Sequence, residues 1–291
     1  MAVPHSASLH AGYGYREETN MIALAQRAGV KATMNFNDRP FTEESVMDDV
    51  HRENIRMHLV PVEVFLSNMR IAGYAFTLER NAMTLVSAPS KLADFSSTQQ
   101  IIEQGYYPEC GELVKKLTGA DHVSCFGFAV RGGGDDSPAG KRKPVMNAHV
   151  DYTVDTVRAV AERIAPDHLK GRRYRFKAIN VWRPIALVER NPLAIVDGAT
   201  VTQGDLCLCR INSSRAETAH SYGWNLAYSP AQQWYYAPDM RPDEALVFTL
   251  IDSDSSGVQW GGHTSFEDPN SAPDAKPRQS IEVRTIAYFA D

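Results

Sequence analysis

FKAINVW, residues Phe176–Trp182, opens a series of short apolar stretches separated by turn residues, and this series decides the fold. The stretches are rich in β-branched and aromatic side chains, which is typical of strands bounded by turns. The later members of the series are 193–196, 205–211, 225–228, 233–236, 245–251, 258–263 and 278–289. Short strands that follow one another in this way predict a mainly β fold, an antiparallel sandwich or barrel.

The rest of the chain fits around this series as one domain. Alternating stretches between residues 57 and 87 predict further strands, and residues 94–118 and 153–164 carry apolar side chains at helical spacing. No internal repeat or Pro/Ser-rich linker divides the 291 residues. We therefore expect one domain over 1–291, with a weakly periodic N-terminal extension over 1–55 and a β core with supporting helices over 56–291.

Composition and charge restrict the class of partner. The chain has 30 basic and 35 acidic residues and a formal net charge of −5, which predicts no nucleic-acid partner and no anionic membrane partner. The apolar runs are far shorter than the roughly 20 residues of a membrane span, and the first residues do not resemble a secretory signal. Four cysteines are too few for a disulfide framework. We expect a cytoplasmic protein with a small-molecule substrate, and a homodimer is the commonest oligomer of such proteins.

The tripeptide His149-Val150-Asp151 carries the clearest chemical signal. Residues two apart on a strand project to the same face, so the imidazole and the carboxylate converge on one point. A non-haem Fe(II) centre uses two histidines and one carboxylate and leaves positions open for other ligands. The spacing therefore predicts a metal site at His149 and Asp151 that takes one further histidine from elsewhere in the chain.

Two histidines compete for that third position. His263 closes the expected strand 258–263, and His220 leads into another expected strand. If residues 267–277 form a hairpin loop, His263 and Arg278 lie side by side on neighbouring antiparallel strands. The residues alone favour His263 and leave His220 as its rival.

An arginine beside an iron ligand is what a 2-oxoglutarate oxygenase requires. The keto acid chelates iron at one end, and an arginine pairs with its distal carboxylate with help from a hydroxyl group. Ser280 shares a strand face with Arg278 and would supply that hydroxyl. Arg284 lies on the same face and remains the alternative anchor.

The order of several blocks along the chain resembles one family. The blocks are Gly105–Glu109, Leu113–Ala120, His149–Asp151, Asn180–Pro184, Trp234–Tyr236, Asp252–Ser253, His263–Pro269 and Arg278–Arg284. In this order they resemble the Fe(II)/2-oxoglutarate-dependent oxygenases related to gibberellin desaturase and to the cephem methoxylase component, a group that includes a fungal meroterpenoid endoperoxidase. The similarity covers residues 55 to 290.

The resemblance implies a fold, a reaction and a set of site residues. It implies a double-stranded β-helix, also called a jelly roll or cupin-like fold, with flanking helices. His149, Asp151 and His263 become the iron ligands, because the His-x-x-Phe-x-x-Pro block at His263 is absent at His220. Arg278 becomes the favoured anchor of 2-oxoglutarate. The implied reaction uses Fe(II), 2-oxoglutarate and O₂ to hydroxylate, desaturate or endoperoxidise a natural-product intermediate such as a terpenoid.

Six further residues are candidates for substrate binding, and each also has a plain role in packing the sheet or the core. They are Tyr152, Asn180, Trp182, Arg183, Trp234 and Tyr236. Two other functional classes stay open at this point. One is a non-oxidative jelly-roll metalloprotein, either an isomerase or a hydrolase, and the other is a catalytically inactive β-sandwich that binds a ligand.

Overall fold

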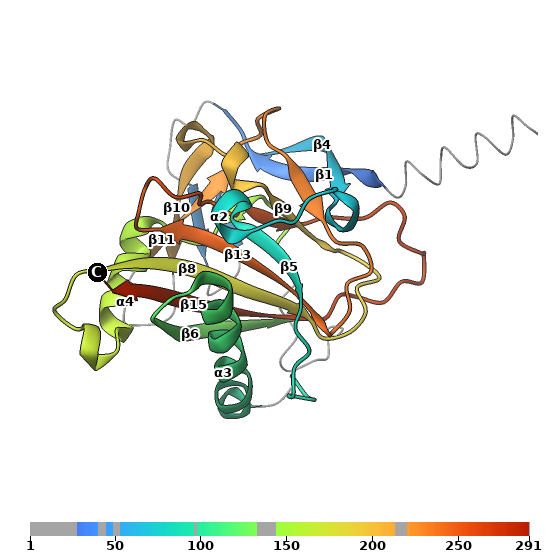
Figure 1. Ribbon diagram of the computed structural model, residues 1–291. Helices are drawn as coiled ribbons and strands as arrows, with labels where there is room; N and C mark the ends of the chain where they lie inside the picture. Colours follow the sequence, from blue (N-terminus) through green and yellow to red (C-terminus); the bar gives the residue numbers. More distant parts are fainter. Residues whose placement is uncertain are drawn as a thin grey trace, which may run out of the picture.

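Two sheets packed face to face form the protein (Figure 1). The computed structural model describes residues 28–39, 45–48, 53–95, 98–132, 144–212 and 220–290, so much of the expected N-terminal extension lies outside the described residues. The large sheet has ten strands in the order β1-β4-β12-β9-β14-β7-β11-β10-β2-β3 within these ranges. The small sheet has five strands in the order β5-β13-β8-β15-β6.

The strands of the large sheet come from the whole length of the chain. They are β1 (Gly29–Asn37), β2 (Ser45–Asp48), β3 (Glu53–Arg56), β4 (Leu59–Asn68), β7 (His149–Val150), β9 (Leu193–Val196), β10 (Leu206–Asn212), β11 (His220–Leu226), β12 (Trp234–Tyr236) and β14 (His263–Ser265). The strands of the small sheet are β5 (Met83–Ser87), β6 (His122–Arg131), β8 (Tyr174–Pro184), β13 (Glu244–Asp252) and β15 (Ser280–Ala290).

The large sheet curls until its first strand meets its middle. The amide of Ala148 donates to the carbonyl of Asn35 over 2.8 Å, and isolated bridges join Asn35 to Asn147 and Asn37 to Ala227. β1 therefore lies beside the segment that leads into β7. The curled large sheet packed against the flatter small sheet is a double-stranded β-helix, and the mainly β, jelly-roll fold expected from the sequence is confirmed. The boundary expected at residue 55 stays a prediction.

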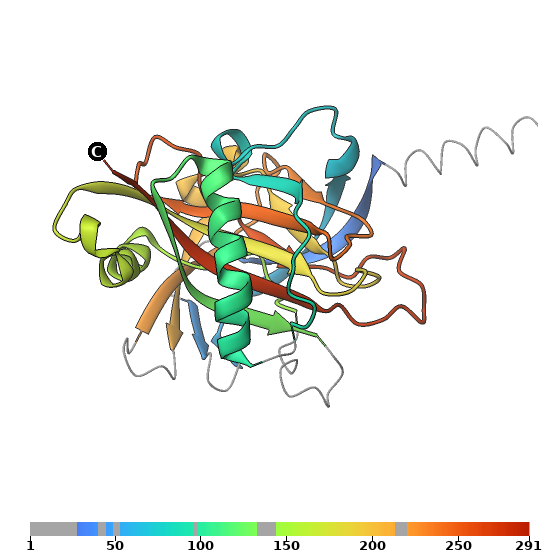
Figure 2. The same ribbon diagram turned by 60° about the horizontal axis from the view of Figure 1, so that its bottom comes forward.

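Two long helices cover the small sheet and one end of the sandwich. α3 (Gln99–Thr118) crosses the outer face of the small sheet (Figure 2). It begins at the Thr98 cap and ends at Gly119, which has φ 68° and whose amide donates to the carbonyl of Lys115. Its buried residues recur every four positions and face the sheet; they are Ile102, Tyr106, Cys110 and Val114. Each large apolar side chain buried in this way contributes about 1.5–3 kcal/mol to the stability of the folded protein.

α4 (Val154–Ile164) begins three residues after Asp151 and closes one end of the space between the sheets. Thr153 caps its first turn, and Val157 and Ala161 point into the inter-sheet core. The remaining short helices are α2 (Leu78–Asn81) and the 3-10 turns Met69–Ile71, Asp167–Leu169, Gly198–Thr200 and Gln203–Asp205. None of the helices in the described ranges is both long and apolar enough to cross a bilayer.

Strand alternation divides the small sheet into an inner and an outer face. On β15 the residues Ile281, Val283 and Ala287 pack under α3. Ile286 and Tyr288, in the alternate register, pack between the sheets. The inner face therefore also receives the polar residues in that same register, which are Ser280, Glu282 and Arg284.

Two expectations about the region of His263 were wrong. Residues 258–262 are not a strand, because Trp260 has a left-handed φ of 62° that breaks the extended chain before β14 begins at His263. β14 and β15 are not a hairpin either, since β14 pairs with β7 and β9 in the large sheet while β15 pairs with β6 and β8 in the small one. The 266–279 segment crosses from one sheet to the other.

Arg183 points to the outer face of β8 and ties α3 to the small sheet. Its Nε donates to the hydroxyl of Tyr106 over 2.7 Å, and its two terminal nitrogens donate to the carbonyls of Pro242 and Ala88. The side chain is almost completely buried. The guanidinium therefore holds together three segments that are distant in sequence.

We expect Arg183→Met to lower the free energy of unfolding by about 3 kcal/mol, because it leaves one hydroxyl and two carbonyls buried without a donor. Urea denaturation followed by circular dichroism measures this loss. Tyr106→Phe removes a single partner and should cost about 1 kcal/mol. An Arg183→Met protein as stable as wild type would show that these three hydrogen bonds contribute nothing.

Candidate metal centre

His149 and His263 are brought together by the pairing of two very short strands. β7 and β14 are antiparallel neighbours, and these two residues are direct register partners. The centroids of their rings are 4.4 Å apart. His220 begins β11, whereas the residue of β11 that pairs with His149 is Asn225, five positions further along. The structure thus places His263, and not the start of β11, beside His149.

Asp151 completes a cluster of three possible ligands. One ligand atom from each of His149, Asp151 and His263 can be chosen so that all three lie within 4.8 Å of one another. His149 Nε2 and Asp151 Oδ1 are 3.4 Å apart. Metal–ligand bonds of about 2.1 Å place neighbouring ligand atoms about 3 Å apart, so small side-chain adjustments suffice to close this cluster around an ion. Two imidazoles and one carboxylate are the donor set of a non-haem iron centre.

Backbone carbonyls orient both imidazoles. His149 Nδ1 donates to the carbonyl of Asn147 over 2.8 Å, and His263 Nδ1 donates to the carbonyl of Gly261 over 3.2 Å. With Nδ1 carrying the proton, Nε2 of each ring is left with the lone pair that binds a metal. Gly223 allows the site to form, because a β-carbon there would lie 2.6 Å from the carbonyl oxygen of Asp151.

Asn180 holds the second oxygen of the carboxylate. Its Nδ2 donates to Asp151 Oδ2 over 2.8 Å, and Asn180 is almost completely buried in β8. Asp151 Oδ1 is the oxygen that faces His149. The carboxylate is therefore fixed with one oxygen engaged by the protein and the other turned toward the two imidazoles.

The electrostatics of the cluster suit a cation. Burial raises the pKa of Asp151, but the hydrogen bond from His149 and the charges of the two histidines outweigh burial and hold that pKa well below its usual range. Burial, together with the neighbouring His149, lowers the pKa of His263 to about 3. Burial also lowers the pKa of His149, yet the contact with Asp151 leaves it raised. An ionised carboxylate and a neutral His263 are the forms that bind a metal, and the proton that His149 Nε2 shares with Asp151 leaves when an ion binds.

Arg278 lies beside the cluster in an almost completely buried position. Its Nη1 donates to the carbonyl of Asn191 over 2.8 Å and to Ser265 Oγ over 2.9 Å, and its guanidinium lies 5.3 Å from the ring centroid of Trp182. Burial, together with the nearby charge of Arg131, lowers its pKa to about 9. Arg278 is therefore a desolvated cation held in one orientation.

Two buried polar atoms at this position lack a hydrogen-bond partner within the described residues. They are Arg278 Nε and Ser280 Oγ. Leaving a buried donor unsatisfied costs about 1–3 kcal/mol, so two of them only two residues apart at the start of β15 indicate a ligand that accepts from both. A carboxylate is the chemical match for a guanidinium and a hydroxyl. The residues present therefore fit a dicarboxylic keto acid whose other end reaches the metal.

Arg284, the alternative anchor, has a different environment. Its Nε lies 3.7 Å from Glu282 Oε1, and it is the register partner of Asn180 on β8. Burial and the charge of Asp151 raise the pKa of Glu282, while Arg284 acts in the opposite direction. Arg284 thus belongs to a buried charged group behind Asp151, whereas Arg278 contacts Ser265 and Trp182 and lies two residues before Ser280.

The substrate candidates divide between the site and other parts of the fold. Asn180 contacts Asp151, Trp182 contacts Arg278, and Tyr152 lies near the ring of Phe126 with centroids 5.9 Å apart. Arg183 projects to the opposite face of β8 from the metal cluster.

Trp234 and Tyr236 also point away from the metal cluster. His263 pairs with Ile195, which pairs with Tyr235, so these three share one face of the large sheet. Trp234 and Tyr236, in the alternate register, pack in the aromatic core inside the curl.

Sequence reasoning did not find several residues of the site. Ser265 follows His263 by two positions on β14, so strand alternation could have placed it on the same face. Phe248 packs against His263 with ring centroids 4.8 Å apart, and no sequence signal distinguishes it from other core residues of β13. The carbonyls of Asn147 and Gly261 are likewise visible only in the folded chain.

The fold and the site together define a class: a double-stranded β-helix metalloenzyme with a centre of two histidines and one carboxylate. Residues 31–288 match a family model described as an oxidoreductase/YMDC permease-like domain. The chain is 32% identical to the alpha-ketoglutarate-dependent dioxygenase phiK of a fungal species, over 91% of this chain and 98% of the relative. It is 31% identical to the Fe(II)/2-oxoglutarate-dependent dioxygenase nvfI of Aspergillus novofumigatus, over 93% of this chain and 96% of the relative.

A solved structure agrees with these relatives. The iron and alpha-ketoglutarate-dependent endoperoxidase NvfI superposes with a TM-score of 0.76 at 26% identity, and the match covers 91% of this chain and 100% of that one. The chain belongs to the family of Fe(II)/2-oxoglutarate-dependent dioxygenases. The family, enzyme class and cofactor pair expected from the sequence are thereby confirmed.

Proposed function

We propose that His149, Asp151 and His263 hold Fe(II), that Arg278 and Ser280 hold the distal carboxylate of 2-oxoglutarate, and that the enzyme oxidises a C–H bond of a natural-product intermediate. The observation that carries this proposal is the pair of unsatisfied buried atoms, Arg278 Nε and Ser280 Oγ, beside the ligand cluster. The names of the relatives, which include dioxygenases, a hydroxylase/desaturase and an endoperoxidase, support the reaction class.

Bound Fe(II) with 2-oxoglutarate and O₂ supplies the oxidising power that removes hydrogen from a C–H bond. The protein contributes orientation. Two carbonyls present the imidazoles, Asn180 fixes the carboxylate, and Trp182 with Ser265 fixes Arg278. Where the substrate lies relative to this centre decides between hydroxylation, desaturation and endoperoxidation.

The substrate approaches from the side on which the centre is still accessible. The side chains of His149 and Asp151 are 17% and 15% exposed, whereas His263 and Arg278 are deeply buried. Tyr152, next to Asp151 in sequence, is itself only partly buried and packs beside Phe126. Tyr152 is accordingly the substrate contact that we favour among the six sequence candidates.

An anaerobic titration tests the proposal. Fe(II) is added to the metal-free protein and 2-oxoglutarate follows, while the weak visible charge-transfer band of an iron-chelated keto acid is recorded. A band, followed by substrate-dependent succinate formation in air, is the expected result. Iron binding without a band would indicate a non-oxidative metalloprotein, and no iron binding would indicate a ligand-binding β-sandwich; either outcome contradicts the proposal.

Asn180→Ala should weaken Fe(II) binding by about 10–100-fold, because residues that orient a metal ligand typically contribute this much to metal affinity. Without Asn180 the carboxylate of Asp151 can rotate or bind through both oxygens. Calorimetric titration under anaerobic conditions measures the affinity, and Asn270→Ala, at an exposed position of the 266–279 segment, is the matched control. Unchanged affinity in Asn180→Ala would show that Asn180 does not position Asp151.

We also propose a cytoplasmic location and a homodimer. The four cysteines are free thiols, which supports a reducing compartment. Closed two-fold dimers are the commonest soluble oligomers, which supports the dimer. Light scattering on the purified protein at two concentrations tests the oligomeric state, and a constant monomer mass would rule the dimer out.

A further inference from the structure

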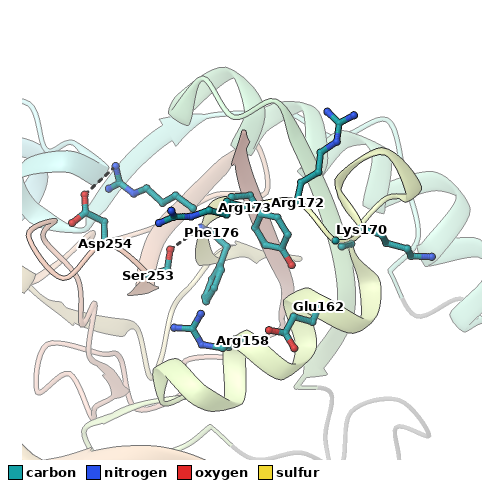
Figure 3. Close-up of a pocket in the computed structure, with 12 residues that line it drawn as sticks. Arg158, Glu162, Lys170, Arg172, Arg173, Phe176, Ser253 and Asp254 are labelled. Carbon is teal, nitrogen blue, oxygen red and sulfur yellow. Dashed lines mark hydrogen bonds and ion pairs between the residues drawn. The ribbon is translucent and has the colours of Figure 1, made fainter. Parts of the chain in front are cut away.

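A cavity lies between α4 and the turn that leads into β8 (Figure 3). Its volume is about 710 Å³, which lies within the range of small-molecule sites. One wall is α4, the opposite wall is the turn that leads into β8, and Ser253 and Asp254 close a third side. None of the three metal-ligand candidates and neither Arg278 nor Ser280 lines it.

The charge of this cavity is opposite to that of the whole chain. Five of its lining side chains are cationic: Arg158, Lys170, Arg172, Arg173 and Arg175. Only two, Glu162 and Asp254, are anionic. The chain as a whole has a net charge of −5, so the cavity is a local concentration of positive charge that the overall composition conceals.

Three of these cations are placed less well for a ligand. Arg175 pairs with Asp252 over 2.5 Å and lies 3.6 Å from Asp254, and Lys170 pairs with Asp167 over 2.7 Å. In the close-up Lys170 and Arg172 extend away from the centre of the cavity, toward its rim. Arg158 lies nearer its centre (Figure 3), and Arg173, which already has an interaction partner in the protein, also lines the cavity.

Arg158 is held in a fixed orientation for a ligand. Its guanidinium lies 5.5 Å from the ring centroid of Phe176, and Phe176 itself is only 2% exposed and cannot move aside. Stacking of this kind engages the flat face of the guanidinium and leaves its N–H edges open. No carboxylate pairs with Arg158 among the described residues.

Tyr174 adds a neutral donor to the cavity. It lines the same cavity as Arg158 and Glu162; burial and the charge of Glu162 raise the pKa of its hydroxyl, while Arg158 acts in the opposite direction. The hydroxyl keeps its proton at neutral pH. A fork of guanidinium N–H groups with a hydroxyl is the donor set that recognises a tetrahedral oxyanion.

We propose that this cavity binds the phosphate group of a small phosphate-bearing molecule, with Arg158 as its principal ligand and Arg173 in a supporting role. Planar guanidiniums bind phosphate through paired hydrogen bonds, which a diffuse positive surface does not provide. The cavity is larger than a phosphate ion, so the remainder of the molecule lies between α4 and the turn 170–174. This site is independent of the metal centre and of the reaction proposed for it.

Calorimetric titration of the full chain with inorganic phosphate, AMP and adenosine tests the proposal. We expect AMP and phosphate to bind and adenosine not to bind. Arg158→Gln/Arg173→Gln should weaken AMP binding by at least 10-fold, and Arg158→Lys should give an intermediate loss because it keeps the charge without the fork. Binding is measured without iron or 2-oxoglutarate, so a failure here leaves the proposed enzymatic function untouched.

The matched control is Lys91→Gln/Lys116→Gln, which removes the same charge from exposed positions outside the cavity. This control should bind AMP as wild type does. Equal losses in both double variants would show that only net charge matters and would overturn the site. Binding of the wild type to phosphatidic acid vesicles, with no binding of AMP, would instead assign the phosphate to a lipid headgroup and overturn the small-molecule proposal.

Discussion

Asp151→Ala is expected to abolish both Fe(II) binding and the visible band of bound 2-oxoglutarate. Asp151 is the single carboxylate of the ligand cluster, and its ionised form is stabilised by both histidines. Changes to residues that merely support a metal ligand lower affinity by about 10–100-fold, so loss of the one anionic ligand should cost at least ~100-fold. Anaerobic calorimetry and absorption spectroscopy provide the two readouts.

A loss of folding must be separated from a loss of metal. Asp155→Ala, on the exposed side of the first turn of α4, removes the same charge four residues away and should bind iron normally. Far-UV circular dichroism should be unchanged in Asp151→Ala, because the carboxylate adds only one hydrogen bond between the two sheets, to Asn180, and the sheets are held together by the apolar core between them. Wild-type iron affinity in Asp151→Ala would overturn the assignment of the ligand cluster.

The local part of the site was predictable because it depends on strand alternation. His149 and Asp151 are two residues apart, and any extended backbone turns both side chains to one face. The same rule put Ser280 and Arg284 on the face of Arg278, and it separated Arg183 from Asn180 and Trp182. Alternation does not say which face is the interior. That choice is made by α3, which packs against Arg183 through Tyr106.

The non-local part was not predictable from spacing. The expected hairpin placed His263 beside Arg278 on adjacent strands, but β14 and β15 belong to different sheets. The two regions still meet, because Arg278 Nη1 reaches across to Ser265 on β14 over 2.9 Å. Register between β7 and β14 joins residues 149 and 263, and no local sequence pattern encodes a pairing over that separation.

Asn180 shows how a residue type can be recognised while its role is missed. Its place on an inward-facing strand suggested contact with substrate. In the structure its amide is already engaged by Asp151, at 2.8 Å. Whether a buried amide meets a substrate or a metal ligand depends on the distance between two sheets, and the sequence of β8 carries no information about that distance.

Arg278→Met is expected to weaken 2-oxoglutarate binding by at least ~100-fold while Fe(II) binding stays close to that of wild type. Removing one partner of a buried charged hydrogen-bonded pair costs about 2–5 kcal/mol, and each 1.4 kcal/mol corresponds to about tenfold in affinity. The metal ligands are untouched by this change. The strength of the visible band at increasing 2-oxoglutarate measures the dissociation constant directly.

Arg284→Met decides between the two possible anchors. Arg284 lies near Glu282, so removing Arg284 should disturb the charged group behind Asp151. It should weaken 2-oxoglutarate binding less than Arg278→Met does. Arg278 also donates to Asn191 and Ser265, so its removal takes away two hydrogen bonds of the fold. Ser280→Ala avoids this loss, because Ser280 Oγ has no hydrogen-bond partner within the described residues. We expect Ser280→Ala to weaken 2-oxoglutarate binding by about tenfold, which corresponds to the loss of one hydrogen bond to a charged group. A larger loss in Arg284→Met than in Arg278→Met, with Ser280→Ala unchanged, would move the anchor to Arg284.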